Sequence, residues 1–334
     1  MKKKPLLVHF HKHHRKTGVT SSVENVLPFL QKDFDTYIYG DQVSWDHLLS
    51  LKELKKKLRE YDQIIIHAHR NKEIQQALWL RFLGYRFKLI VSRHAATKPS
   101  KFTLWLMKKA DVRIGLIDSM KELPFEISII GHGVDTKRFV PKENIKISQI
   151  KQPHFMVVAG RVRPKKGHET FVKAFIPILK ERPDWAGVII GKVDDQKFVL
   201  NLKKLITENK LENQFYFIEE TRAIEEWYQA SKATVVPSHS EGFSLVCLEA
   251  MACESICVAT KDVGVHSNVI EDTKTGVLFE AGNHNELNSI LNAIVSNNHQ
   301  ISTKEARTYI EHNWSAQKEA DALKEVYLRS INKS

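Results

Sequence analysis

The stretch ATVVPSHSEGFSLVCLEAMA, residues 233–252, contains the pattern that recurs through the chain. Its start, 233–238, is rich in β-branched residues, which is typical of a buried strand. Its end, Leu245 to Ala252, is an apolar run typical of a helix, and Ser244 is the expected N-cap. The stretch therefore predicts a strand, a glycine-containing loop and a helix.

The same alternation of short strands and longer helical segments extends over most of the chain. Strands are predicted at PLLVHF, TYIYG, QIIIHAH, FKLIVSR, VRIGLI and ISIIGHG, and then at HFMVVAGR, AGVIIGK, QFYFIEE, ATVVPS, SICVATK and GVLFEAG. Repeated βα units form doubly wound parallel sheets with ligand sites at the carboxyl ends of the strands. The polar segment PKENIKISQIKQP is the expected linker. We predict two Rossmann-like α/β domains that face each other across a cleft, residues 1–145 and 151–310, with a closing helix in 311–334.

Within the opening stretch, Glu241 falls in the loop and Glu249 in the helix. Any surface helix could match a pair at this spacing. However, Gly242 lets a ligand approach the backbone, and the free N–H groups of a helix start bind phosphate. A carboxylate beside such a site repels phosphate and suits hydroxyl groups, which donate hydrogen bonds to it. The stretch indicates a ligand with both phosphate and sugar groups.

The segment GRVRPKKGHE, residues 160–169, supplies a second site for an anion. Arg161, Arg163, Lys165 and Lys166 follow a predicted strand, where side chains reach a ligand crevice. Two cations beside a diphosphate would stabilise the charge on a departing nucleotide. A solvated basic loop is the alternative.

The composition bounds the class of protein. The 334 residues carry a formal charge of +12, and residues 1–140 hold 26 Lys and Arg against 14 Asp and Glu. This surplus fits solvated helix faces, or a surface for nucleic acid, acidic lipid or a phosphorylated substrate. No apolar run reaches the roughly 18 residues of a membrane span. The apolar run near residue 5 is too short for the core of a secretory signal, so no such signal is expected there. The three cysteines, Cys247, Cys253 and Cys257, lack zinc-like spacing and are expected to be buried in a protein of the cytoplasm.

These residues resemble a known family. PSHSEGFSLVCLEAMA, with GRVRPKKGHETFVKAF before it and DVGVHSNVIEDTKTGVLF after it, resembles the donor domain of glycosyltransferase family 4, which comprises retaining enzymes of the two-domain GT-B fold. The resemblance is strong over residues 155–282 and weaker through the first half. There TGVTS, SRHAATKPSKFTLWLMKKAD and GHGVDTKRF are most similar to lipopolysaccharide core mannosyltransferases.

The resemblance implies roles by position. Glu241 would contact the donor sugar and Glu249 the ribose hydroxyls. Arg161 and Lys166 would hold the diphosphate, and His94 would lie near the transferred sugar. The implied catalytic residues are Glu241, His94, Arg161 and Lys166, and the further donor contacts are Gly18, Gly242, Phe243, Ser244 and Leu245. The resemblance implies no metal and no cofactor. It also implies front-face attack by the acceptor hydroxyl, whose proton the leaving diphosphate takes, so no protein nucleophile is expected.

Three segments depart from the family pattern. Residues 253–256, Cys-Glu-Ser-Ile, replace the usual G-x-P-V, Asn268 replaces an acidic residue, and His132 replaces the asparagine of N-G-V-D. These changes leave the fold prediction intact and leave the details of sugar selection open.

Other stretches carry weaker signals. The basic segment 9–18 is rich in histidine but has no accompanying carboxylate or cysteine, so an anionic acceptor is favoured over a metal ion. The predicted acceptor contacts are His11, His13, Arg15 and Lys16, and an exposed basic loop is the alternative. Asp33 and Asp35 match a D-x-D metal motif without supporting context. The segment 98–113 would form an interfacial helix or bury its apolar residues against the sheet.

Together these features predict a cytoplasmic, metal-independent transferase, peripheral on the inner face of the bacterial cell membrane. It would move a hexose, with mannose from GDP-mannose favoured, onto an anionic lipopolysaccharide core glycolipid. A glucosyl- or N-acetylglucosaminyltransferase that uses a UDP-sugar is the first alternative. A nucleic-acid-binding α/β protein would also explain the charge, but it would leave Glu241 and Glu249 unexplained, so no nucleic-acid partner is expected.

Overall fold

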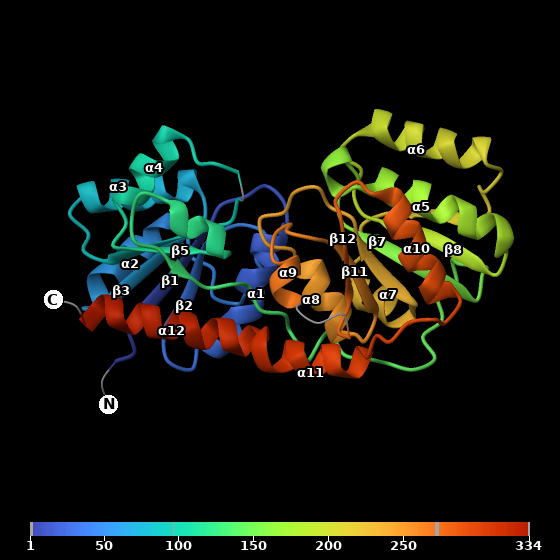
Figure 1. Cartoon of the computed structure of the whole chain (residues 1–334). Helices are drawn as coiled ribbons and strands as arrows, with labels where there is room; N and C mark the ends of the chain where they lie inside the picture. The colour runs from blue at the N-terminus through green and yellow to red at the C-terminus, as the bar shows by residue number, and fades with distance from the viewer. Residues whose placement is uncertain (1–2, 96, 271–273, 333–334) are drawn as a thin grey trace. The chain divides into compact units, whose positions relative to one another are not determined.

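The computed structural model describes residues 3–95, 97–270 and 274–332, and the chain divides into two compact units. The first unit combines the chain up to Gly133 with the chain from Trp314 onward, and the second runs from Val134 to Asn313 (Figure 1). Each unit has one six-stranded sheet whose neighbouring strands are all parallel. Within the described residues, all twelve strands lie where the sequence predicted them, which confirms the doubly wound α/β class.

In the first unit the strand order is β2-β1-β3-β4-β5-β6. The strands are β1 (Leu6–His11), β2 (Asp35–Gly40), β3 (Ile64–Ala68), β4 (Lys88–Arg93), β5 (Val112–Gly115) and β6 (Ser128–Ile129). The helices are α1 (Gly18–Leu30), α2 (Leu51–Glu60), α3 (Asn71–Phe82), α4 (Lys101–Lys108), the 3-10 helix η1 (Asp118–Glu122) and α12 (Ala316–Asn332).

Alternation along the strands places helices on both faces of this sheet. Leu6, Val8 and Phe10 of β1 pack with residues of α2, α3 and α4. Leu7 faces the other way and packs with α1 and α12. Helix α12 packs against α1 in this unit (Figure 1).

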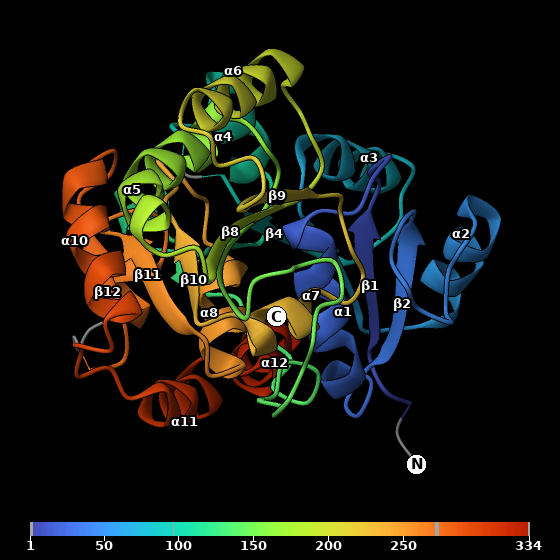
Figure 2. The same cartoon turned by 90° about the vertical axis from the view of Figure 1, so that its right-hand side faces the viewer.

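In the second unit the strand order is β12-β11-β10-β7-β8-β9. The strands are β7 (His154–Ala159), β8 (Trp185–Ile190), β9 (Phe215–Ile218), β10 (Ala233–Val236), β11 (Ile256–Thr260) and β12 (Val277–Phe279). The helices are the 3-10 helix η2 (Pro164–Lys166), α5 (His168–Glu181), α6 (Gln196–Glu208), α7 (Ile224–Ala230), α8 (Leu245–Ala252), α9 (His266–Val269), α10 (His284–Val295) and α11 (Thr303–Asn313). Figure 2 shows α5 and α10 on one side of the sheet and α8 on the other. The three cysteines are free and buried, as predicted.

The two units differ from the predicted domains 1–145, 151–310 and 311–334. The segment after Gly133 belongs to the second unit, because Arg138 pairs with Glu225 at 2.8 Å and the side-chain amide of Gln229 donates to the carbonyl of Val140 at 2.7 Å. The C-terminal helix belongs to the first unit, since α12 buries its apolar face there. These contacts join residues that are far apart in the sequence.

Candidate active site

The loops that follow β7 and β10 pack against each other in the second unit. These strands are paired in parallel, so both loops leave the same edge of the sheet. Gly167, just before α5, has a φ of 68°, and a Cβ at this position would lie 1.8 Å from the carbonyl oxygen of Pro237. The amide of His239 also donates to the carbonyl of Lys165 at 2.9 Å. Only glycine fits where the two loops meet.

This packing joins two of the predicted catalytic residues. The ammonium of Lys166 lies 2.5 Å from Oε1 of Glu241, and the hydroxyl of Ser238 donates to the same oxygen at 2.7 Å. Burial alone would raise the pKa of Glu241, but the charge and hydrogen bond of Lys166 and the hydrogen bond of Ser238 lower it below its ordinary value. Glu241 is therefore a paired carboxylate that accepts hydrogen bonds.

The loop after β11 holds the backbone of the predicted donor loop. Gly264 has a φ of 59°, and a Cβ there would lie 2.3 Å from the carbonyl oxygen of Phe243. The amide of Val265 donates to the same oxygen at 2.9 Å, and the Phe243 side chain is buried. The backbone around Gly242 is thus fixed by residues from a third loop.

Ser244 differs from the capping role predicted for it. Helix α8 begins at Leu245, as predicted, but Ser244 has a φ of 101° and its side chain makes no capping hydrogen bond. A non-glycine residue in such a conformation costs about 1–3 kcal/mol. Its Oγ is also buried without a hydrogen-bond partner among the residues that the structure describes. Backbone strain and a buried hydroxyl without a partner, both at a helix start, are consistent with a site for an anionic ligand.

Glu249 lies in the second turn of α8. The hydroxyl of Tyr228 donates to its Oε2 at 3.1 Å. Desolvation raises the pKa of Glu249 to about 7, against the opposing effect of that hydrogen bond. The carboxyl group therefore gains and loses its proton near neutral pH, a property that the sequence alone did not indicate.

A pocket of about 510 Å³ opens at the carboxyl ends of β7, β8 and β9, and its lining includes Val162, Gly191, Phe217 and Glu219. This volume is within the usual range of roughly 300–1,000 Å³ for small-molecule sites. Arg161, next to Val162 in the chain, pairs with Asp194 at 3.1 Å. The role of Arg161 toward a diphosphate stays a prediction.

The basic loop after β1, in the first unit, agrees only in part with its predicted role. His11 is fully buried, and its ring nitrogens lie 3.1 Å from the carbonyl oxygen of Asp41 and 3.2 Å from Oγ1 of Thr20. Strand β1 extends through His11 and buries it, which does not favour the predicted acceptor contact of His11, and that contact stays a prediction. Lys16 is exposed and pairs with Glu24 at 3.1 Å.

The other first-unit predictions stay predictions. The His13 ring lies 2.9 Å from the backbone oxygen of Arg15, so the two residues form a local turn. A Cβ at Gly18 would meet nothing within 4 Å, which leaves open space at the start of α1.

His94 follows β4, and both of its ring nitrogens have partners in the first unit. Its Nε2 lies 3.0 Å from Nδ1 of His69, and its Nδ1 lies 3.1 Å from Nε2 of His132. Burial holds the pKa of His94 well below its ordinary value, although part of the residue stays exposed. The sequence-based prediction for His94 did not include these partners. The available signal was the recurrence of histidine at the ends of successive predicted strands.

Comparisons with known proteins agree with this architecture. The family model described as glycosyl transferases group 1 matches residues 140–313, which is more than half of the chain. The chain is 28% identical over 333 residues to the lipopolysaccharide core biosynthesis mannosyltransferase LpcC of Rhizobium leguminosarum bv. viciae, covering 94% of this chain and 93% of that protein.

Two solved structures match nearly the whole chain. Sucrose-phosphate synthase from Thermosynechococcus elongatus has a TM-score of 0.83 at 18% identity, covering 99% of this chain and 100% of that chain. Anabaena Alr3699/HepE in complex with UDP-glucose has a TM-score of 0.80 at 18% identity, covering 97% of this chain and 99% of that chain. At this identity the likeness shows the fold alone, and it confirms the predicted GT-B type.

Proposed function

Because the chain belongs to the group 1 glycosyl transferases, we propose that it is a retaining enzyme that transfers a hexose to a lipopolysaccharide core acceptor. Mannose from GDP-mannose is the favoured donor. The name of the Rhizobium relative, which matches over nearly the whole length of both chains, supports this choice of sugar and acceptor.

The observation that carries the proposal is the contact of Lys166 with Glu241 next to the strained Ser244. A nucleotide sugar needs cations for its diphosphate and acceptors for its hydroxyl groups. Lys166, together with Arg161, would hold the diphosphate, while Glu241 would accept hydrogen bonds from the sugar. Glu249 would accept them from the ribose, and the backbone from Gly242 to Leu245 would border the phosphates.

This arrangement favours front-face transfer over a covalent enzyme intermediate. Glu241 is engaged by Lys166 and Ser238, so its carboxylate is already neutralised and is a poor nucleophile. The cation of Lys166 would stabilise the charge that develops on the departing diphosphate. The diphosphate oxygen would then take the proton from the acceptor hydroxyl as it attacks on the same face.

Helices α3 and α4 of the first unit present a surface suited to an anionic membrane. They contact each other, and we call their exposed aromatic residues the aromatic face. Its members are Trp79, Phe82, Phe102 and Trp105. Leu106 of the same α4 helix is fully buried, so the segment 98–113 both packs on the sheet and exposes aromatic rings.

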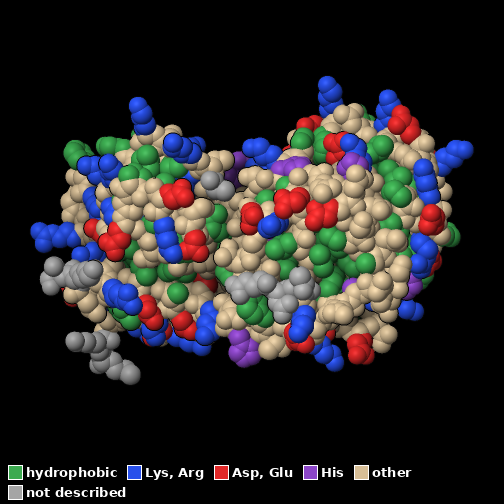
Figure 3. All heavy atoms as spheres, viewed as in Figure 1, with side chains coloured by type: hydrophobic (Ala, Val, Ile, Leu, Met, Phe, Trp, Pro, Cys, Tyr) green, Lys and Arg blue, Asp and Glu red, His purple; other side chains and the backbone are tan. Residues whose placement is uncertain are grey.

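Lysines surround the aromatic face, and Figure 3 shows hydrophobic and basic side chains intermixed over α3 and α4. The ammonium of Lys55 lies 5.0 Å from the ring centroid of Trp79, and that of Lys109 lies 5.8 Å from that of Trp105. Aromatic rings with lysines fit the headgroup region of a bilayer that contains acidic lipid. Among the described residues, no helix is long and apolar enough to span a membrane.

The donor proposal is tested by calorimetric titration with GDP-mannose, UDP-glucose and UDP-N-acetylglucosamine, followed by mass spectrometry of a lipopolysaccharide core acceptor after reaction. We expect GDP-mannose to bind most tightly and the acceptor to gain one hexose. Tight binding of a UDP-sugar would replace the donor assignment, and an unchanged acceptor would contradict the acceptor assignment.

Membrane association is tested by co-sedimentation with vesicles of phosphatidylglycerol or phosphatidylcholine. We expect binding to the anionic vesicles alone, and a loss of binding in Phe82→Ser with Trp105→Ser. The matched control is Leu200→Ser, which removes an exposed apolar side chain from α6 in the second unit. Equal binding of wild type and the aromatic variant would contradict the proposed membrane surface.

A further inference from the structure

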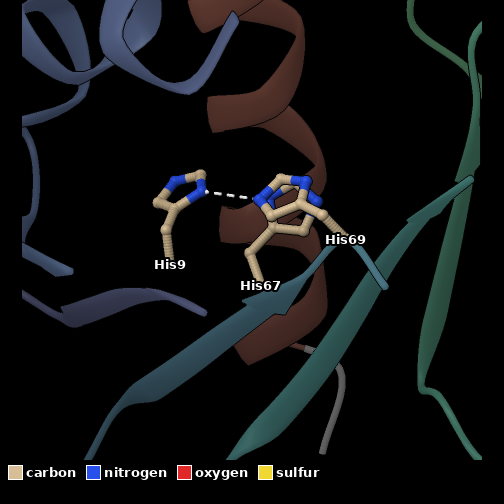
Figure 4. A group of neighbouring side chains, drawn as sticks. All are labelled: His9, His67 and His69. Carbon is tan, nitrogen blue, oxygen red and sulfur yellow. Dashed lines mark hydrogen bonds between the residues drawn. The ribbon is translucent and has the colours of Figure 1, made fainter. Parts of the chain in front are cut away.

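Histidines from several strands meet on one face of the first sheet. His9 of β1 and His67 of β3 are register partners, so their side chains share a face. His69 follows β3, and its ring lies 4.3 Å from that of His67 between centroids. Figure 4 shows His9 directed toward His69, with His67 beside it. The hydroxyl of Tyr327 on α12 lies 2.7 Å from Nδ1 of His67, which places that helix over the cluster.

Four histidine rings of the first unit form a continuous hydrogen-bonded series, the histidine row, which consists of His9, His69, His94 and His132. Nδ1 of His9 lies 3.2 Å from Nε2 of His69, and Nδ1 of His69 lies 3.0 Å from Nε2 of His94. Nδ1 of His94 lies 3.1 Å from Nε2 of His132, and Nδ1 of His132 lies 2.9 Å from Oε1 of Glu319. In every contact an Nδ1 faces the next group, so the row has a direction and ends at a carboxylate.

That direction determines where the protons lie. A neutral imidazole has one N–H donor and one acceptor nitrogen, and a carboxylate only accepts. Nδ1 of His132 also lies 2.6 Å from Oγ of Ser22, whose hydroxyl donates to Oε1 of Glu319 at 3.1 Å. Both neighbours of this Nδ1 therefore present an acceptor oxygen, so His132 donates from Nδ1, which leaves its Nε2 to accept from His94. His94 and His69 likewise donate from Nδ1 and accept at Nε2. The row ends at His9, whose Nε2 must then be an acceptor.

The far end of the histidine row is a buried nitrogen atom. Nε2 of His9 is buried and has no hydrogen-bond partner within the described parts of the chain. Burial also lowers the pKa of His9 to about 3 and holds the pKa of His69 and His94 well below the ordinary value. One proton on each ring satisfies each contact of the row and leaves Nε2 of His9 unpaired in either proton order, so the direction of the row rests on the acceptor oxygens of Glu319 and Ser22.

We propose that Glu319 is a positioning residue for His94. Through His132 it holds the His94 ring with the proton on Nδ1 and the lone pair on Nε2, and the same order extends to His69 and His9. His94 is the partly exposed ring of the row. A contact between His94 and the transferred sugar rests on the proposed function, whereas the proton positions do not.

The three rings in Figure 4 are also close enough to share a metal ion, because one nitrogen of each of His9, His67 and His69 lies within 4.8 Å of the others. The hydrogen bonds favour the proton assignment instead. Both nitrogens of His69 belong to the histidine row, and His67 bonds Tyr327 and, at 2.7 Å, the hydroxyl of Ser92. A metal ion would have to break several of these contacts. Metal binding is therefore the alternative that the Zn²⁺ titration below would detect.

The variant Glu319→Gln tests the proton positions, because the backbone amide of Gly133 determines which way the new side-chain amide points. The amide of Gly133, which can only donate, faces Oε2 of Glu319 at 2.7 Å. The oxygen of the variant side chain must take that place, so its NH₂ group faces His132 and Ser22. An NH₂ group is a donor, so the Ser22 hydroxyl loses its acceptor on residue 319 and turns its proton to Nδ1 of His132, 2.6 Å away. His132 then accepts through Nδ1 and carries its proton on Nε2. Every ring of the histidine row is forced into the other tautomer.

The measurement is NMR of the full-length protein with ¹⁵N-labelled histidine, in which long-range ¹H–¹⁵N correlations identify the protonated nitrogen of each ring. Single histidine-to-glutamine variants assign the signals. We expect Nδ1–H at all four rings in the wild type and Nε2–H at all four in Glu319→Gln. The matched control is Glu325→Gln, an exposed position on the same helix, which should leave the wild-type pattern unchanged.

Several results would overturn the proposal. One is Nε2–H at His94 in the wild type, which needs no variant to fold. Another is a change confined to His132 in Glu319→Gln. A third is displacement of the His9, His67 and His69 signals by one equivalent of Zn²⁺, which would assign the cluster to a metal.

The transfer assay links the row to activity. With a donor that binds, we expect kcat of Glu319→Gln to fall by about tenfold or more at unchanged KM, since the wrong tautomer disables a positioned histidine. Unchanged kcat together with reversed tautomers would overturn the role of Glu319 toward His94. Failure of every donor to react would contradict the proposed function. The proton positions measured by NMR would not be affected by that result.

Discussion

Lowering the pH from 8 to 6 should weaken the binding of a nucleotide sugar through Glu249. Desolvation raises the pKa of this carboxyl to about 7 in the free protein. Ribose hydroxyls donate hydrogen bonds to the proposed site, and an ionised carboxylate accepts them on both oxygens. Protonation below pH 7 turns one of these oxygens into a donor, so the protonated form binds the ribose less well.

The size of the effect follows from the pKa. With a pKa of about 7, the carboxyl is about nine-tenths ionised at pH 8 and about one-tenth ionised at pH 6. If the ionised form alone binds, the dissociation constant rises about tenfold over this range, which corresponds to about 1.4 kcal/mol.

The assay is isothermal titration calorimetry at pH 8, 7 and 6. The titrant should be the intact nucleotide sugar, because a terminal phosphate titrates near pH 6 and would add a pH dependence of its own. Glu249→Gln should bind more weakly at pH 8 and lose the pH dependence. Glu212→Gln, an exposed position in the same unit, should bind as the wild type does.

Two outcomes would refute this reasoning. Equal affinity of the wild type at pH 8 and pH 6 would mean that Glu249 does not contact the ligand as a carboxylate. A pH dependence that persists in Glu249→Gln would assign the proton to another group.

Further predictions concern the stability of the fold and of the site. Lys166→Met should lower the free energy of unfolding by about 3 kcal/mol, because it leaves the Glu241 charge largely buried without its partner. Urea unfolding of the double variant with Glu241→Gln should show recovery, and a double variant no more stable than the single one would contradict the pairing. Gly167→Ala should lower the urea midpoint far more than Gly84→Ala, since both glycines have positive φ but only the first has a carbonyl oxygen in the way. Equal losses would mean that the loop contact is unimportant. Stability should fall as the pH drops from about 6.5 toward 5, because the unfolded chain binds protons at histidines that stay neutral when folded. His9, with a pKa of about 3, lowers the stability by about 1.4 kcal/mol per pH unit, and Glu249, with a pKa of about 7, offsets about the same amount. Burial also holds the pKa values of His67, His69 and His94 well below the ordinary value, so the net change is a loss. Unfolding midpoints that stay constant over this range would contradict the neutral, buried rings.

Features that depend on neighbouring residues were predictable from the sequence. The strand at 233–236 and the helix from Leu245 are determined by a β-branched run, a glycine loop and an apolar run, all within twenty residues. The same local physics applies to the other eleven strands. The resemblance of these loops to a known family then indicated Lys166 and Glu241 as site residues.

Features that depend on packing between distant segments were not predictable. The backbone strain at Ser244 arises in a loop that is held by the loop after β11, and the raised pKa of Glu249 requires the surrounding protein to exclude water. The burial of His11 follows from the length of β1 and its neighbours rather than from the basic residues around it.

The sequence by itself determined the order of strands and helices, the fold class and the loops that carry the candidate donor site, because periodicity, glycine and helix starts act over a few residues. Only the tertiary structure decided that the C-terminal helix belongs to the first unit. It also decided that Lys166 neutralises Glu241 and that a row of histidines from His9 to His132 ends at Glu319. Burial, charge pairing and proton position are properties of atoms brought together from distant parts of the chain, and the spacing of residues in the sequence does not contain them.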